Sequence, residues 1–232
     1  MDHSKIIAEV AKETLVPLGI FQKGRSRIRI DDRGWWIIVI EFQPSGFSKG
    51  SHLNVGAMWL WHEKDHFSFD SGSDAGCRIS KFVEYVDEKQ FRPEAVKLAS
   101  AAKEEVLRLR SLFASIHRVA RYLPGQAKRN ENVWTELAAA IALGYVGDAS
   151  RARGLFKSIE RRKPVHEWVR LLQQTALGFA ATLDRPPDFQ RNVKETILRT
   201  RKLLKLPERI ELDIDIDENN VRRPRKSRFP FI

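Results

Sequence analysis

The spacing of apolar residues changes twice along this chain, and these changes constrain its fold more than any other feature. From Ser4, apolar residues recur at helical spacing until Pro17 ends the pattern. Between residues 22 and 61 they alternate with polar residues, and from Arg92 the helical spacing returns. We therefore predict an α+β fold, with an N-terminal helix and an antiparallel β-meander followed by a long helix and α-helical hairpins.

Three strands account for most of the alternating region. The first ends at the turn residues 31–34, and the second, at 35–42, is apolar on both faces, which is typical of a central strand covered on two sides. The third strand spans 53–61. We expect a loop over 62–80, where Ser, Asp, Gly and His are frequent, and a short fourth strand at 82–86.

The long helix is predicted to begin at Arg92-Pro93-Glu94, because Pro is favoured in the first turn of a helix and an acid at its positive end. An apolar stripe carries this helix at least to Phe113. Pro124 and Gly125 are expected to end the segment.

The sequence after Gly125 repeats at a fixed offset of 34 residues. The repeated residues are Trp134, Leu137, Ala142, Leu143, Gly144 and Tyr145, which recur as Trp168, Leu171, Ala176, Leu177, Gly178 and Phe179. The offset predicts two helical hairpins, whose second helices lie at 149–162 and 187–205. We expect Trp134 and Trp168 to belong to the cores of these hairpins.

The first copy is similar to a tetratricopeptide repeat. Its possible signature positions are Trp134, Leu137, Ala138, Ala152, Phe156 and Pro164. The stretch from Trp134 to Phe156 is about two residues too long for that pattern, and Pro186 stands where the second copy needs a counterpart of Ala152. The resemblance therefore implies tetratricopeptide-like packing rather than membership of the family.

Three short motifs in the N-terminal part carry a second resemblance. They are Leu18-Gly19-Ile20 before Gly24-Arg25, Trp36 with Val39-Ile40 before Gln43-Pro44-Ser45, and Leu53-Asn54-Val55-Gly56. With these motifs, residues 5–115 resemble a bacterial family known as domain of unknown function 4304, which usually has Phe in place of Ile20. The resemblance implies a small α+β domain with a helix before an antiparallel meander, and it carries over no functional residue.

We divide the chain into three segments. Residues 1–123 are predicted to form the α+β domain with its antiparallel sheet and long closing helix, residues 124–208 the basic helical-hairpin region, and residues 209–232 an alternating strand or arm with a basic tail. Two hairpins are too few for a free-standing solenoid. We therefore expect them to pack on the long helix, with the sheet as a further possible surface, in one continuous body.

The formal net charge of +11 lies almost entirely in the helical segment. Residues 92–208 hold 23 basic against 12 acidic residues, whereas residues 1–91 hold 12 against 13. Two helix faces supply candidate anion-binding groups, namely Arg153, Lys157 and Arg161 on one helix and Arg191, Lys194, Arg201, Lys202 and Lys205 on the other. Both faces also fit ordinary solvated surfaces opposite an apolar stripe.

A third group of candidates lies on the first strand. Arg25, Arg27 and Arg29 alternate with apolar or small residues, so they are predicted to project from one strand face, near Gln43 and Asn54 on the neighbouring strands. Arginine side chains on a rigid sheet suit a phosphate or a carboxylate. The alternative is a solvated strand face held by ion pairs.

Catalytic and metal signatures are not recognisable in this sequence. His62, Asp65, His66 and Cys77 are ligand types for zinc, but they fall in a predicted loop without a second paired spacing, so we predict no metal site and no cofactor. We find no nucleophile elbow, phosphate-binding loop or dinucleotide fingerprint and assign no catalytic residue. The sequence has a single cysteine, and it has no apolar run of the ~20 residues that span a bilayer. Both observations favour a cytoplasmic protein.

These observations favour a bacterial cytoplasmic binding protein without enzymatic activity. Its basic helical half is expected to engage an anionic partner, either nucleic acid or an acidic protein. One alternative is an immunity-type or scaffold protein that binds an acidic protein. Another is an enzyme that acts on a small anionic substrate at the arginine-bearing sheet face, which would require a concave site there.

Overall fold

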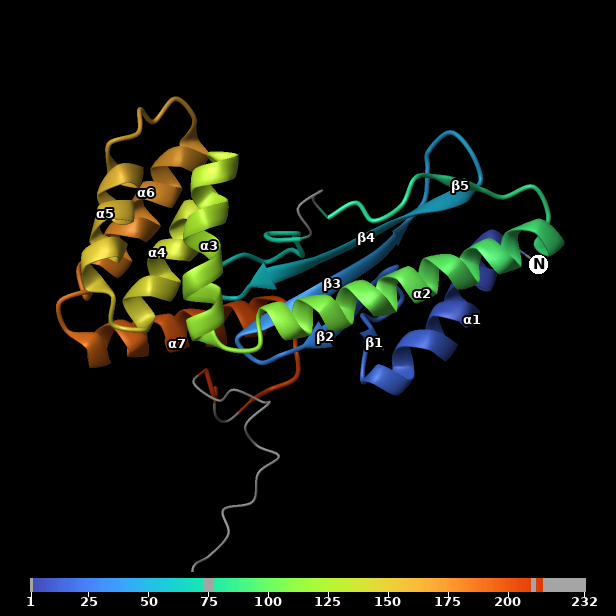
Figure 1. The fold of residues 1–232 in the computed structure, drawn as a ribbon, viewed down its shortest axis with the longest axis horizontal. Coiled ribbons are helices and arrows are strands. Elements are labelled where there is room, and N and C mark those ends of the chain that lie inside the picture. The colour runs from blue at the N-terminus through green and yellow to red at the C-terminus, as the bar shows by residue number, and fades with distance from the viewer. Residues whose placement is uncertain (1, 73–76, 210–211, 215–232) are drawn as a thin grey trace, which may run out of the picture.

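The computed structural model describes residues 2–72, 77–209 and 212–214, and it confirms the α+β class (Figure 1). The chain begins with helix α1 (His3–Leu15) and the short 3-10 helix η1 (Val16–Leu18). The described residues then form a five-stranded antiparallel sheet in the order β1 (Phe21–Gln22), β2 (Ile28–Asp32), β3 (Trp36–Gln43), β4 (Gly50–Trp59) and β5 (Val83–Glu84). The helices that follow are α2 (Glu88–Leu112), α3 (Ile116–Asn130), α4 (Val133–Tyr145), α5 (Ala149–Glu160), α6 (Glu167–Ala180) and α7 (Pro186–Leu203).

Strand β3 is the central strand that its apolar run predicts. Every residue from Ile37 to Ile40 is fully buried, and β3 pairs with β2 on one side and β4 on the other. The turn before β3 is closed by the Asp32 carboxylate, which accepts a hydrogen bond from the Gly34 backbone, where φ is +89°. A glycine fits this turn because it adopts positive φ without strain.

Helices α1 and α2 pack together, and α2 also packs on β3 and β4. Helix α2 begins at Glu88, earlier than predicted, because Asp87 caps it by accepting a hydrogen bond from the Gln90 backbone. At its other end, the buried Phe113 ring meets the edges of Trp36 and Trp59.

The prediction that Pro124 and Gly125 end the helical segment is wrong, since Pro124 lies inside α3. The break instead falls just after Phe113, where Ser115 caps α3 by accepting a hydrogen bond from the Arg118 backbone. A proline inside a helix is unfavourable, and the buried stripe of Val119, Leu123 and Ala127 offsets this.

The predicted second helices of the hairpins are present as α5 and α7, although the two repeat copies occupy different environments. Helix α4 packs on α3, α5 and α7 and is buried almost throughout, whereas α6 lies at the edge. Leu137 is fully buried while its counterpart Leu171 is 54% exposed. One cluster of buried residues still runs from α1 through α7, so the described parts share a continuous core.

An ion pair joins the helical part to the sheet where α7 reaches the β2–β3 turn (Figure 1). The Arg201 guanidinium is 3% exposed and donates to both oxygens of Asp32, at 2.9 and 2.7 Å, and to the carbonyls of Gly34 and Pro207. Burial alone would raise the pKa of Asp32, but the hydrogen bonds from Arg201 and Gly34 outweigh it and leave that pKa below its ordinary value.

The chain beyond α7 continues along this junction. Leu212 and Ile214 are buried, and residues 209 and 212–214 form no strand. Most of the predicted arm and the whole basic tail lie outside the described residues. Within residues 2–72, 77–209 and 212–214, no helix combines the length and the apolar character that a membrane crossing requires.

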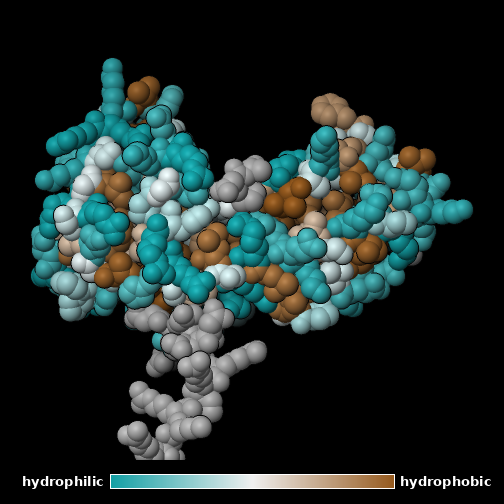
Figure 2. Space-filling model, in the orientation of Figure 1, coloured by the Kyte–Doolittle hydropathy of each residue, from teal (hydrophilic) through white to brown (hydrophobic). Residues whose placement is uncertain are grey.

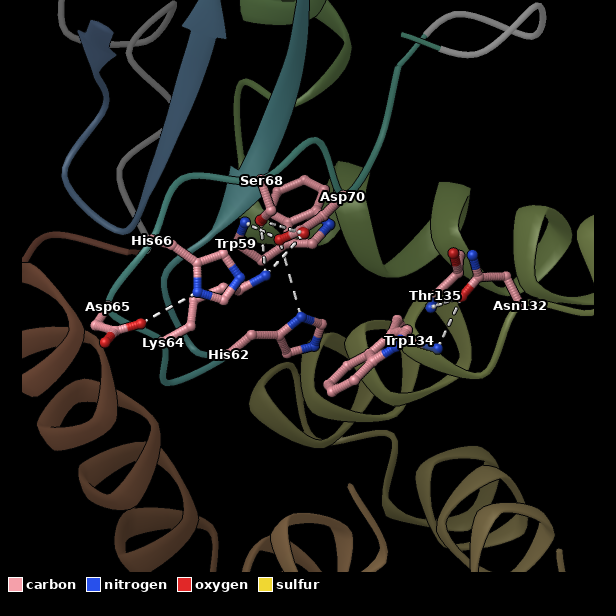
Figure 3. A network of polar contacts seen from close by, with 10 residues as sticks. All are labelled: Trp59, His62, Lys64, Asp65, His66, Ser68, Asp70, Asn132, Trp134 and Thr135. Carbon is pink, nitrogen blue, oxygen red and sulfur yellow. Dashed lines mark hydrogen bonds and ion pairs between the residues drawn. The ribbon is translucent and has the colours of Figure 1, made fainter. Parts of the chain in front are cut away.

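The loop after β4 folds around the Asp70 carboxylate, whose side chain is 9% exposed (Figure 3). Asp70 accepts hydrogen bonds from the Trp59 backbone at 2.9 Å, the Lys64 ammonium at 2.9 Å and the Ser68 hydroxyl at 2.7 Å. Beside it, His62 is 3% exposed, and burial lowers the pKa of His62 to about 4 despite the attraction of Asp70. The imidazole is therefore neutral at pH 7.

Removing one partner from the buried junction should strongly destabilise the protein. We expect Arg201→Met to lower the free energy of unfolding by about 3 to 5 kcal/mol, because it leaves the Asp32 carboxylate buried without its counter-charge. Arg153→Met, which removes an exposed pair with Asp184, is the matched control and should change stability little. Urea unfolding of both variants checks this, and equal losses would contradict the role of the junction.

Stability should also fall on mild acidification. The unfolded chain protonates His62 near 6.5 and the folded protein only near pH 4, so the unfolded state binds more protons between these values. Lowering the pH from 7 to 5 should therefore remove about 2 kcal/mol of stability through this residue. His62→Gln should flatten the pH dependence measured by urea unfolding, and an unchanged slope in that variant would refute the prediction.

Candidate anion-binding site

A cavity of about 230 Å³ lies between the start of α1, the turn before β2 and the adjoining ends of β3 and β4. Its lining residues are His3, Ser4, Ile7, Ala8, Gln22, Arg25, Ser26, Arg27, Arg29, Phe42, Pro44, Gly50 and Ser51. All three arginines predicted on the first strand are among them. The lining includes no acidic side chain among the described residues.

Arg29 is the buried charge of this cavity. It lies on β2 and is only 5% exposed. Its guanidinium donates one hydrogen bond to the Ala8 carbonyl of α1, at 3.3 Å, and its carbon lies 5.5 Å from the centre of the Phe42 ring. Burial lowers the pKa of Arg29 from its ordinary value, and no charge among the described residues opposes that shift.

Two other arginines with buried partners show what Arg29 lacks. Arg110 donates to both oxygens of Asp31, at 2.8 and 2.9 Å, and Arg201 binds Asp32 in the same way. Arg29 pairs with no carboxylate among the residues that the structure describes. A buried charge without a counter-charge is unfavourable, so this guanidinium is suited to receive an anion.

The nearby carboxylates have other partners. Asp31, two residues along the same strand and on the same face as Arg29, is taken by Arg110. Glu9 of α1 pairs with Arg92 at 3.1 Å, and Asp2 pairs with His3 at 2.9 Å. Asp31 and Glu9 therefore do not neutralise the positive charge of the cavity, whereas Asp2 lies beside the cavity through its contact with the lining residue His3.

Arg25 and Arg27 reach the cavity from a turn and not from a strand. Gln22 and Ser26 fold that turn through hydrogen bonds to the carbonyls of Ser26 and Lys23, both at 2.7 Å, so β2 begins only at Ile28. Both arginines are exposed. The expectation that all three project from one strand face is therefore wrong, although they border the same cavity.

The expected neighbours of these arginines also lie elsewhere. Arg29 is opposite Ile40 on β3, whereas Asn54 is opposite Glu41, one residue further along and thus on the other sheet face. Asn54 donates hydrogen bonds to Glu41 and Gln43 there, at 3.1 and 3.0 Å. Gln43 and Asn54 therefore do not contribute to the cavity.

The start of α1 borders the cavity. His3 and Ser4 occupy the first turn of this 13-residue helix, where the Asp2 carboxylate also lies and is bonded to His3. Sequence reasoning missed His3, Ser4 and Ser51, because no local pattern brings a helix start next to a strand 25 or more residues away. The position of Phe42 could have been predicted from the sequence, because alternation along β3 places it on the same sheet face as Arg29.

The basic residues of α5 and α7 are partly used within the molecule. Arg153 pairs with Asp184 and Arg191 with Asp188, both at 2.5 Å, while Arg201 is buried against Asp32. Lys194 is half-buried, and the Lys205 carbonyl accepts a hydrogen bond from Lys23. Exposed basic side chains remain at Lys157, Arg161, Lys202 and Lys205, consistent with the hydrophilic surface of the helical part in Figure 2.

The zinc-type residues do not converge. Among the described residues, no group of three or more His, Cys, Asp or Glu side chains is placed to hold a metal ion. His66 is exposed and bonds to Asp65, whereas Cys77 is half-buried against Gly56. Burial raises the pKa of the Cys77 thiol to about 11, so it is protonated at pH 7.

No protein-family model, curated protein or solved structure matches this chain. The resemblances to the domain of unknown function 4304 family and to tetratricopeptide packing therefore stay predictions.

Arg29 and Arg110 should respond to the same substitution with opposite signs. In buffer without phosphate or sulfate, we expect Arg29→Met to raise the free energy of unfolding by about 1 kcal/mol, because it removes an uncompensated buried charge. Arg110→Met should lower it by about 3 kcal/mol, because Asp31 loses its partner. Urea unfolding measures both, and a large loss for Arg29→Met would show that Arg29 serves stability instead.

Proposed function

We propose that the protein binds a small anion, or the anionic group of a larger molecule, in the cavity at Arg29. The observation that carries this proposal is the burial of the Arg29 guanidinium without a carboxylate partner among the described residues. Arginine presents a planar fork of N–H donors that fits phosphate and carboxylate oxygens. Arg25 and Arg27 supply further charge at the same cavity.

The size of the cavity supports a small ligand group. Its volume of about 230 Å³ is below the range of roughly 300 to 1,000 Å³ that is usual for sites of drug-sized molecules. An adjoining hollow of about 440 Å³ shares His3, Arg27 and Pro44 with it. This hollow provides room for the rest of a larger ligand whose anionic end lies at Arg29.

Binding, and not catalysis, is the activity we propose for this cavity. A hydrolase or transferase needs a general base within reach of its substrate. His3 is a lining side chain of that type, because its Nδ1 atom bonds to Asp2 and its Nε2 atom lies 3.4 Å from the Ser4 hydroxyl. The buried charge of Arg29 accounts for binding of an anion without any reaction, and an enzyme acting on a small anion is the alternative that a detected turnover would favour.

A second candidate function is the binding of nucleic acid or an acidic protein through the helical half. The exposed Lys157 and Arg161 on α5 support it. The two basic helix faces offer fewer available basic side chains than the sequence indicated, because Arg153, Arg191 and Arg201 already pair with carboxylates.

Calorimetric titration with inorganic phosphate, sulfate and acetate tests the first proposal. We expect saturable binding of at least one anion, weakened about tenfold or more by Arg29→Gln, because a hydrogen bond to a charged group contributes about 1.5 to 3 kcal/mol. Arg170→Gln, which removes an exposed arginine from α6, is the control with the same change in charge and should leave binding unchanged.

The same variants separate the two candidate functions. Heparin and DNA are titrated at low and at high salt. If the helical half binds them, Arg29→Gln should leave the affinity unchanged, and the Lys157→Gln/Arg161→Gln double variant should lower it. Equal anion binding by the wild-type protein and Arg29→Gln would refute the proposed site.

A further inference from the structure

A second cavity, of about 490 Å³, opens between the loop after β4 and the helices α4 and α6. The loop contributes His62, Lys64 and Asp70 to its lining, and the helices contribute Trp134, Leu171 and Thr175 among others. In Figure 3, His62 lies between Asp70 and Trp134. This volume falls within the range of roughly 300 to 1,000 Å³ typical of small-molecule sites.

His62 presents unused hydrogen-bonding groups in this cavity. It is 3% exposed, yet neither its Nδ1 nor its Nε2 atom has a hydrogen-bond partner among the described residues. Its Nδ1 atom is 3.9 Å from the nearer Asp70 oxygen, which is too long for a hydrogen bond. Buried polar groups are nearly always hydrogen-bonded, so an unpaired imidazole that lines a cavity points to a ligand. Both nitrogens are closed to solvent in this conformation, so the ring must turn about its broad second torsion to bond to that ligand.

An aromatic wall faces this imidazole. The Trp134 ring lies 5.8 Å from the His62 ring and is stacked on Trp168, with ring centres 6.1 Å apart and planes inclined by 23°. Trp134 is 40% exposed and Trp168 46%, so the expectation that both tryptophans are core residues is wrong. Exposed aromatic surface beside a cavity is characteristic of ligand and interaction sites.

The charged side chains at this cavity are paired. Lys64 and Asp70 form an ion pair at 2.9 Å, and Glu63 pairs with Arg199 at 2.9 Å. The imidazole is neutral at pH 7, so it offers one N–H donor and one nitrogen acceptor. This cavity therefore differs from the one at Arg29, because the described residues that line it carry no uncompensated charge to attract an ion.

We infer that this cavity binds a neutral planar heteroaromatic ring, which stacks against Trp134 and forms a hydrogen bond with His62. The part of the Trp134 indole that Trp168 does not cover supplies the stacking surface, and Leu171 supplies the apolar side. The ring class includes purines and indoles, and it is set by the combination of a flat aromatic wall with one neutral donor and acceptor. The inference is independent of anion binding at Arg29.

Calorimetric titration of the full chain with adenosine and with indole tests this inference, and toluene serves as an aromatic probe without hydrogen-bonding groups. We expect saturable binding of adenosine or indole, and much weaker binding of toluene. His62→Leu should weaken binding about tenfold, which is the effect of losing one hydrogen bond of about 1.4 kcal/mol. Trp134→Leu should weaken it about fivefold or more through lost stacking.

Two controls keep the result interpretable. Because His62 is buried, circular dichroism must show that His62→Leu is folded, and the Trp134→Leu substitution at an exposed position tests the same site if it is not. Leu198→Ser, at an exposed position of α7 outside the cavity lining, and Arg29→Gln should both bind like the wild-type protein.

Three outcomes would overturn the inference. One is the absence of saturable binding of adenosine and of indole at millimolar concentration. Another is binding that persists unchanged in Trp134→Leu and in a folded His62→Leu. The third is toluene binding as tightly as indole, because the His62 hydrogen bond would then contribute nothing.

Discussion

The buried carboxylate of Asp32 is the contact on which both parts of this molecule depend. It accepts a hydrogen bond from Gly34 and so closes the turn that starts the central strand β3. The same carboxylate accepts hydrogen bonds from both terminal nitrogens of Arg201, which lies on helix α7. The Asp32 side chain therefore links the turn between β2 and β3 to helix α7. On the other face of the sheet, Trp36, Trp59 and Phe113 form an aromatic cluster at the end of α2.

Strand β2 shows how this arrangement leaves one charge available. Within five residues it carries Arg29, Asp31 and Asp32, and both acids are neutralised by arginines from the helices α2 and α7. Arg29 instead meets a backbone carbonyl and an aromatic ring. A protein selected only for stability would remove such a charge, because a buried ion is costly without a partner. Its presence beside a cavity is the observation that supports the proposed binding site.

Local patterns predicted the fold class and most of the elements, but they predicted neither the break between α2 and α3 nor the sites. The apolar run at 35–42 predicts the central strand because burial on both faces leaves a direct trace in the sequence. The repeated glycines show the limit. A methyl group at Gly144 would lie 2.5 Å from the Phe189 ring, whereas at Gly178 it would meet nothing within 4 Å. The repeat predicts two similar helices, but it does not show which of them is central. Because it carries no information about their surroundings, it also led to the wrong prediction that Trp134 and Trp168 are core residues. The positions of Arg25, Arg27 and His62 depend on turns and distant contacts that no periodicity records.

The separation of Asp32 and Arg201 along the chain has a consequence for synthesis. The two residues are 169 positions apart, so the turn that contains Asp32 leaves the ribosome long before its partner exists. Until α7 is made, the Asp32 carboxylate lacks its counter-charge and must stay hydrated. The final packing step therefore awaits an almost complete polypeptide, and a chain that stops short of Arg201 ends with an unsatisfied charge at the base of its central strand.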